Sequence, residues 1–132
     1  MATGDLTGAT TTRAAGLKHR RLNAQGLIRD RVVAHVASDF SLDARDLMSP
    51  TRGAPRTALA RQVAMYLAHT AFGLNFRTIG RAFGRDRTTV AHACRMIEDG
   101  RDDDWFDSRL SALELTCRTQ PHPLRVRRQE GA

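Results

Sequence analysis

Apolar residues return every three or four positions along most of this 132-residue chain, a spacing that predicts an all-α protein. The first stripe, between Asn23 and Phe40, indicates an amphipathic helix. Ser41 stands where it can cap a short helix over Leu42 to Met48, which we expect to close over the first. The apolar positions of the first stripe are Leu27, Ile28, Val32, Val33, Val36 and Phe40.

A loop and two longer helices account for much of the remaining pattern. Residues 49–56, SPTRGAPR, contain two prolines and a glycine, so we expect a loop. Thr57 is predicted to begin the longest helix, which Gly73 ends, and its alanines would let other helices approach closely. Near the C-terminus, three consecutive acids precede a helix that closes the core through Trp105, Phe106, Leu110, Leu113 and Cys117.

Two short helices joined by a tight turn are predicted between Asn75 and Arg95. Asn75 can cap the first helix, Gly84 interrupts the pattern, and Asp86 can cap the second. The first helix has its apolar stripe at Phe76, Ile79 and Phe83, and the second at Val90, Ala93, Cys94 and Ile97. The opposite face of the second helix is polar, with Thr88, His92, Arg95 and Asp99 on it and Arg87 and Thr89 at its exposed start.

This arrangement is typical of a helix-turn-helix, whose second helix enters the DNA major groove by its N-terminal end. An ordinary helical hairpin with a solvated face would show the same apolar spacing. Charge favours the DNA-binding interpretation, because residues 52–95 hold eight arginines (52, 56, 61, 77, 81, 85, 87 and 95) against the single acid Asp86. Residues 98–107 reverse this balance, with six acids (98, 99, 102, 103, 104 and 107) against Arg101.

Arginines outside the second helix are candidate phosphate or minor-groove ligands. Arg52 and Arg56 lie in the loop, where a guanidinium could enter a minor groove, although a solvated connector fits the loop equally well. Arg61 and Gln62 are expected in the exposed first turn of the longest helix, where they could hold a phosphate. Arg85 and Arg95 complete the set of expected backbone contacts.

The cysteines and the absence of several sequence motifs argue against metal-binding, catalytic and secreted classes of protein. Cys94 and Cys117 stand far apart on apolar faces, so buried thiols are expected rather than a disulfide or a zinc site. No nucleophile pattern, nucleotide loop or secretory signal occurs, so we expect a cytoplasmic protein that is not an enzyme and that binds no cofactor, nucleotide or membrane. The basic segments 1–22 and 119–132 are predicted to be disordered flanks of a single domain at 23–118.

The segments ARQVAMYLAH and NFRTIGRAFGRDRTTVAHACRMIED resemble the C-terminal DNA-binding domain of the bacterial replication initiator DnaA over about residues 26–118. The resemblance implies a compact helical, Trp-repressor-like fold that reads a short DNA box. It implies that Arg52 enters the minor groove and that Arg61 and Gln62 contact phosphates. It also implies that the bases are read by Asp86, Thr88, Thr89 and His92.

The sequence departs from the family pattern in two ways, one at the start of the second helix of the helix-turn-helix and one in its domain composition. Arg87 replaces a histidine, and one glycine is missing before Arg85. Since arginine prefers the O6 and N7 atoms of guanine, the preferred box is expected to differ and Arg87 joins the base contacts. The phosphate loop of the initiator's ATPase is not found in the sequence, so we expect a free-standing domain.

These observations favour a double-stranded-DNA-binding protein that recognises initiator-like boxes and modulates replication initiation or transcription nearby. The alternative is a non-catalytic adaptor that uses the same fold to bind the replication initiator or its partners. Absence of DNA binding at low salt would favour the adaptor.

Overall fold

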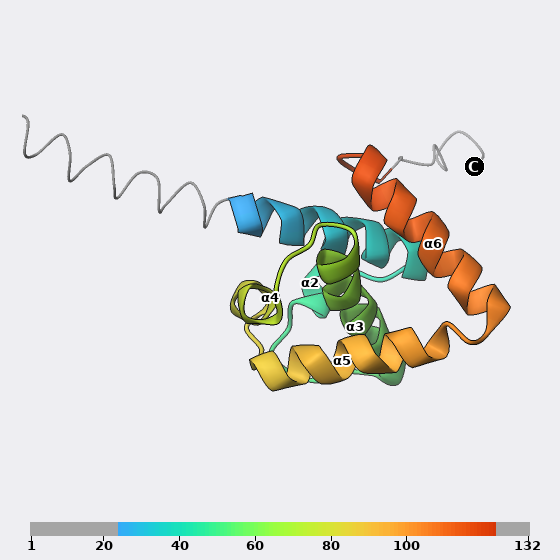
Figure 1. Ribbon diagram of the computed structural model, residues 1–132. Coiled ribbons are helices and arrows are strands. Elements are labelled where there is room, and N and C mark those ends of the chain that lie inside the picture. Colours follow the sequence, from blue (N-terminus) through green and yellow to red (C-terminus); the bar gives the residue numbers. More distant parts are fainter. Residues whose placement is uncertain (1–23, 124–132) are drawn as a thin grey trace, which may run out of the picture.

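The computed structural model describes residues 24–123, and all the regular elements in this range are helices (Figure 1). A first helix at residues 24–40 is followed by α2 (Ala44–Leu47), α3 (Pro55–Thr70), α4 (Phe76–Phe83), α5 (Arg87–Gly100) and α6 (Asp104–Thr119). The prediction of an all-α fold is confirmed. The expected disordered segment 1–22 lies outside the described residues. Of the expected C-terminal tail, Thr119 belongs to α6 and residues 124–132 also lie outside the described range.

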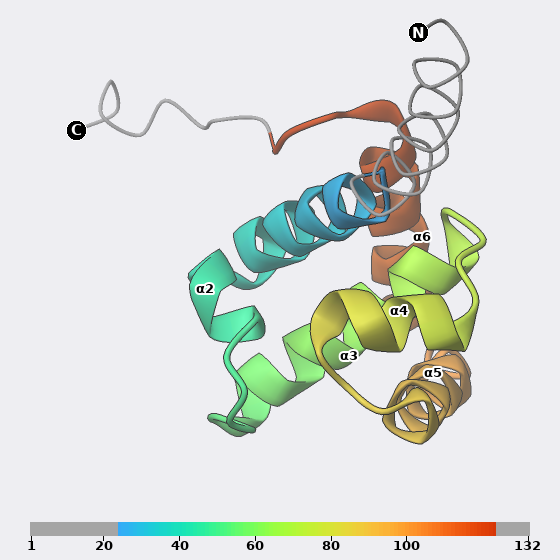
Figure 2. The ribbon, with the colours of Figure 1, turned by 90° about the vertical axis from the view of Figure 1, so that its left-hand side faces the viewer.

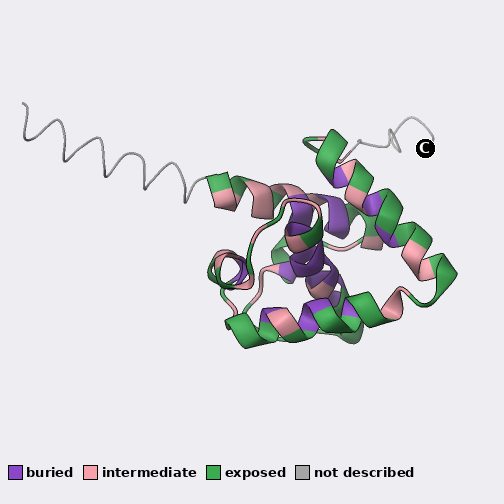
Figure 3. Cartoon of the chain, in the orientation of Figure 1, coloured by how far each residue is buried: buried purple, intermediate pink, exposed green. Residues whose placement is uncertain are grey.

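Helix α3 occupies the centre of the molecule and is the most buried element (Figure 3). It contacts α2, α4 and α5. Its alanines at 60, 64 and 68 are almost completely buried, and Val63 and Leu67 are equally inaccessible. Because an alanine side chain projects so little from the helix, neighbouring helices can lie close to α3 along this row. The expectation of a central alanine-rich helix is therefore confirmed.

Two helix starts differ from the prediction. Helix α3 begins at Pro55 rather than Thr57, because proline lacks an N–H that the first turn would leave unbonded anyway. Helix α2 is capped by Asp43, whose carboxylate accepts a hydrogen bond from the Arg45 amide at 2.8 Å. Ser41 instead turns the chain with a positive φ of 57°. Hydrogen bonds from Arg45 lower the pKa of Asp43 to about 2, so this cap stays ionised at neutral pH.

Leu27 and Trp105, which were expected in the core, are exposed by 69% and 67%, and Leu59 near the start of α3 is exposed by 38%. Each stands in the first turn or two of its helix, where the apolar stripe extends past the surface that other helices cover. The guanidinium of Arg109 lies 5.0 Å from the centre of the Trp105 ring and covers part of it. The helical spacing of these residues agrees with the prediction, but the expected burial of Leu27 and Trp105 was wrong.

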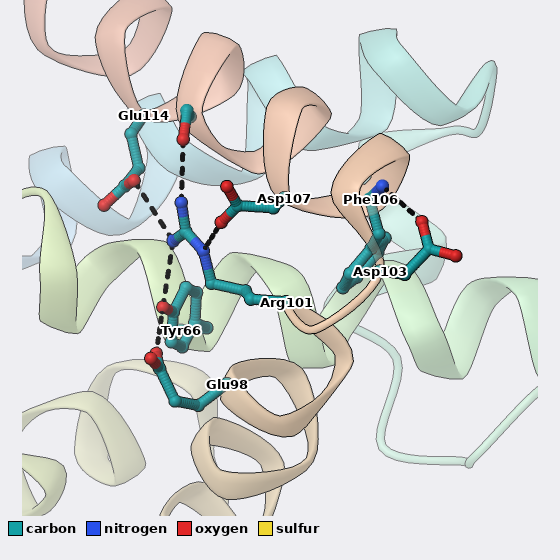
Figure 4. Close-up of polar contacts among 8 residues, drawn as sticks. Tyr66, Glu98, Arg101, Asp103, Phe106, Asp107 and Glu114 are labelled. Atoms are coloured by element: carbon teal, nitrogen blue, oxygen red, sulfur yellow. Dashed lines mark hydrogen bonds and ion pairs between the residues drawn. The ribbon is translucent and has the colours of Figure 1, made fainter.

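The corner between α5 and α6 is fastened by Arg101 (Figure 4). Desolvation opposes its charge, but its hydrogen bonds to acids and to Tyr66 raise the pKa of Arg101 above the ordinary value. Burial and a hydrogen bond to Glu98 raise the pKa of Tyr66 to about 12, so its hydroxyl remains a donor. Arg101 donates to Asp107 at 2.5 Å, Ser111 at 2.8 Å, Tyr66 at 3.0 Å and Glu114 at 3.3 Å.

The two cysteines are buried and free, as the sequence predicted. Burial raises the pKa of both Cys94 and Cys117 to about 11, so neither is a reactive thiolate at neutral pH. No group of three metal-ligating side chains occurs between residues 24 and 123. Across the same range, no helix combines the length and apolar character needed to cross a membrane.

Gly80 allows α4 to press against the turn that leads into α5. A Cβ atom at this position would lie 2.5 Å from the carbonyl oxygen of Arg85. The Arg85 amide donates to the Gly80 carbonyl at 2.8 Å, so the two backbones are joined at their closest approach. The relative placement of α4 and α5 therefore requires glycine here.

We predict that Gly80→Ala lowers the free energy of unfolding by about 1 to 3 kcal/mol, because the added methyl group forces two backbones apart. Urea unfolding would measure it. The matched control is Gly26→Ala in the first helix, where a Cβ atom would meet its nearest neighbour at an ordinary 3.7 Å. This control should be neutral or stabilising. Equal destabilisation by both substitutions would contradict the close-approach argument.

Candidate nucleic-acid interface

Helices α4 and α5 form the predicted two-helix unit, and two of the three residues expected to bound it, Asn75 and Gly84, have the expected roles. Asn75 caps α4 by accepting a hydrogen bond from the Thr78 amide at 2.8 Å. Gly84 ends α4 in the left-handed conformation, with φ 66° and ψ 38°. Asp86 occupies the N-cap position of α5, but its side chain makes no capping hydrogen bond. The exposed carboxylate of Asp86 is therefore available to other donors.

The two faces of α5 divide as the sequence predicted. Val90, Ala93, Cys94 and Ile97 are buried on one side. The other side is exposed and carries Thr88, His92, Arg95 and Asp99, while Arg87 and Thr89 are exposed at the start of the helix. The side chains of Arg87, Thr88, Thr89, His92 and Arg95 make no hydrogen bond to other described residues. The first turns of α5 thus present several unused polar groups to solvent.

A groove of about 460 Å³ separates α5 from the loop at residues 49–54 and the start of α3. The loop and α5 lie along the same lower edge of the molecule in Figure 2. Six of the predicted site residues line this groove, namely Arg52, Arg61, Gln62, Arg85, Thr89 and His92. Pro50, Pro55, Met65 and Met96 add apolar walls that the sequence analysis did not identify. Met96 could have been found, because it lies one turn beyond His92 on the same helix face.

Arg61 was expected in the exposed first turn of α3, and this was wrong. Because α3 begins at Pro55, Arg61 falls in the second turn, and only 5% of it is exposed. Its guanidinium donates to three backbone carbonyls of the preceding segment: Leu47 at 2.7 Å, Asp46 at 3.0 Å and Arg52 at 3.1 Å. Desolvation lowers the pKa of Arg61, with a contribution from nearby Arg85. The side chain therefore ties the end of α2 and the following loop to α3.

Arg85 holds the same loop from the other side. Its Nη2 atom donates to the carbonyl of Ser49 at 2.7 Å, across 36 residues of sequence. Arg52, whose own carbonyl is bound by Arg61, extends an exposed side chain with no partner among the described residues. Two arginines thus fix the backbone of the loop, and a third projects from it.

Arg56 and Arg95 do not line the groove. Arg56 donates to the carbonyl of Phe40 through both Nε (3.1 Å) and Nη2 (2.5 Å), and its guanidinium lies 5.4 Å from the centre of the Phe40 ring. It belongs to a second cavity of about 230 Å³, which Trp105 also lines. The structure therefore separates Arg56 from the other predicted contacts. Arg95 remains exposed on the polar face of α5.

Comparison with known proteins assigns this unit to a family. A family model described as "Bacterial dnaA protein helix-turn-helix" matches residues 29–97. The chain is 46% identical over 70 residues to the chromosomal replication initiator protein DnaA of Bifidobacterium animalis subsp. lactis (strain AD011), covering 52% of this chain and 12% of that protein. It is 40% identical over 75 residues to DnaA 2 of Chlamydia trachomatis serovar D, covering 57% of this chain and 16% of that protein.

Two solved structures have a similar fold. One, described as the crystal structure of a DNA replication initiation factor, superposes with a TM-score of 0.70 at 28% identity, covering 87% of this chain and 35% of that chain. Another, described as replication initiator DnaA bound to AMPPCP and single-stranded DNA, gives a TM-score of 0.68 at 29% identity, covering 81% and 32%. The present chain therefore spans only a fraction of the length of each relative.

We predict that Arg61→Ala lowers the free energy of unfolding by roughly 3 kcal/mol, because three carbonyls lose a charged donor. Gln62→Ala is the matched control, since the neighbouring half-buried side chain makes no hydrogen bond to a described residue and should cost less than about 1 kcal/mol. Urea unfolding of the two variants would compare them. If Arg61→Ala were as stable as the control, the loop would not depend on this side chain.

Proposed function

The chain belongs to the bacterial DnaA helix-turn-helix family, and on that premise we propose that it binds double-stranded DNA sequence-specifically through α5 and the loop at 49–54. The family consists of DNA-binding domains connected with replication initiation. The observation that carries the proposal is the exposed first turn of α5, whose polar side chains have no partners within the described chain while the opposite face is buried. Such a helix can enter a major groove without losing internal contacts.

The base contacts in this proposal come from Asp86, Arg87, Thr88, Thr89 and His92. Arg87 would bind the O6 and N7 atoms of a guanine, and the two threonines can contact either polar base edges or a thymine methyl group. Each good contact of this kind discriminates against a wrong base by about 1 to 3 kcal/mol. Because Arg87 stands where the family pattern has histidine, the preferred box would differ from the usual initiator box at the base that Arg87 contacts.

The loop supplies the second part of the proposed interface. Arg52 is the candidate for the minor groove, because its side chain projects from a backbone that Arg61 and Arg85 hold in place. A fixed loop loses little conformational entropy on binding, which favours affinity. Gln62, Arg85 and Arg95 remain candidates for phosphate contacts. Arg56 is a weaker candidate than the sequence suggested, since two of its nitrogen atoms already bind Phe40.

In the cell, such binding would modulate replication initiation, or transcription near initiator-like boxes, with no catalytic step. The protein would act in the cytoplasm at the nucleoid, with double-stranded DNA as its main partner and DNA-bound proteins such as the initiator as further ones. Selection of bound duplexes from a random pool at two salt concentrations tests the proposal. Enrichment of one short motif supports it, whereas no binding even at low salt would favour the adaptor.

We predict that Arg87→Ala relaxes base preference at one position of the selected motif, with a loss of about 1 to 3 kcal/mol on the preferred duplex only. Arg95→Ala is the control, because Arg95 is equally exposed on the same helix but two turns further from the tip. It should weaken binding to all sequences alike. Competition binding with single-base variants of the motif would distinguish the effects of the two substitutions. Identical loss on every duplex for both variants would refute the assignment of Arg87.

A further inference from the structure

Two arginines on the outer face of α4 have no role in the interface described so far. Arg77 and Arg81 are four residues apart, so they stand on the same side of the helix. Both are exposed, opposite the buried Ile79 and Phe83. Neither makes a hydrogen bond or an ion pair with any residue between 24 and 123. We call this pair the α4 arginine strip.

Most arginines elsewhere in the described fold are paired. Arg29, Arg45, Arg101 and Arg109 each form a salt bridge with an acid, and Arg31 donates to two backbone carbonyls at the end of α6. The unpaired ones are concentrated on the loop, α4 and α5, with Arg118 on α6 as an exception. Arginines near acidic side chains therefore form ion pairs, whereas the α4 arginine strip has no acidic partner among the described residues.

Helix stability does not explain the strip. Arg77 stands in the first turn of α4, where the positive end of the helix dipole disfavours a cation, and this turn contains no acid to offset it. Arg81, one turn later, repels Arg77 further. Arg81 alone would suit the last turn of the helix. An anion bound against the outer face would offset both unfavourable terms.

The placement of α4 indicates which anion. Because Gly80 lets α4 press on the turn before α5, α4 lies beside the tip of α5. In Figure 1, α4 and the start of α5 lie on the same side of the molecule, away from the acidic α5–α6 corner. In a helix-turn-helix complex the first helix crosses the DNA backbone. We propose that the α4 arginine strip binds phosphates that flank the base-read segment on one side, and this rests on the proposed function.

The strip thus lengthens the footprint of the domain without adding sequence information. Phosphate contacts contribute affinity that falls with salt, and they position the protein instead of reading bases. Two such contacts change the slope of log K against log salt by about 1.8, since each contributes roughly 0.9 on duplex DNA. The effect requires the duplex to extend past the box on the α4 side.

The experiment compares the wild-type chain with the double variant Arg77→Gln, Arg81→Gln on three duplexes. One ends at the edges of the selected motif, and the others extend it by about one helical turn, roughly 10 base pairs, on one side or the other. The wild type should bind one extended duplex more tightly than the short one. The variant should lose that preference, lower the salt slope on that duplex by about 1.8, and bind the short duplex unchanged.

Two controls make the result specific. The double variant Arg109→Gln, Arg118→Gln removes the same charge from α6 and should keep the preference. Arg77→Lys, Arg81→Lys should restore the salt slope, because lysine also binds phosphate. Equal loss on all three duplexes, or equal loss in the α6 variant, would overturn the inference in favour of a general charge effect.

Failure of the proposed function gives a different result. The wild type could show no sequence preference and still bind an extended duplex through Arg77 and Arg81. That result would support phosphate binding by the strip and contradict sequence-specific recognition. If the wild type bound no duplex at low salt, both the proposed function and phosphate binding by the strip would be contradicted.

Discussion

The burial of the apolar side of α5 against the alanine-bearing α3 is the interaction on which the rest of this structure depends. Val90, Ala93 and Ile97 leave solvent almost completely, and burial of a side chain such as Val90 or Ile97 contributes about 1.5 to 3 kcal/mol. That packing fixes the rotation of α5 about its axis. Once the apolar side is turned inward, the residues one half-turn away must face solvent. The polar tip is thus a geometric consequence of core formation.

The loop at 49–54 is held by a different kind of interaction. With two prolines and a glycine in and beside it, the loop cannot form a helix, and its carbonyls need donors. Arg61 supplies one donor from α3, to the Arg52 carbonyl, and Arg85 supplies one from the turn before α5, to the Ser49 carbonyl. Both bonds run from the framework to the loop, so the distance between the loop and α5 is set by side chains of charged residues. The groove keeps its shape because these arginines are committed to carbonyls.

The helical periodicity of the chain predicted the elements and the inward side of α5, since these depend on spacing alone. The cap at Asn75 and the stop at Gly84 could also be predicted, because their chemistry is local. The burial of Arg61 could not, because it depends on carbonyls up to 15 residues away that approach it only in the folded chain. The same is true of Arg56, whose partner Phe40 lies 16 residues earlier. The number of arginines can be read from the sequence, whereas only the tertiary structure shows which of them have no hydrogen-bond or ion-pair partner.

In the proposed complex, the loop and the first turns of α5 form the surface that meets DNA. Backbone amide chemical shifts recorded during titration with a selected duplex test it most directly. The largest changes are expected at residues 49–54 and 86–92, with little change along α6 and around Trp105. Changes centred on α6, with residues 86–92 unaffected, would contradict it.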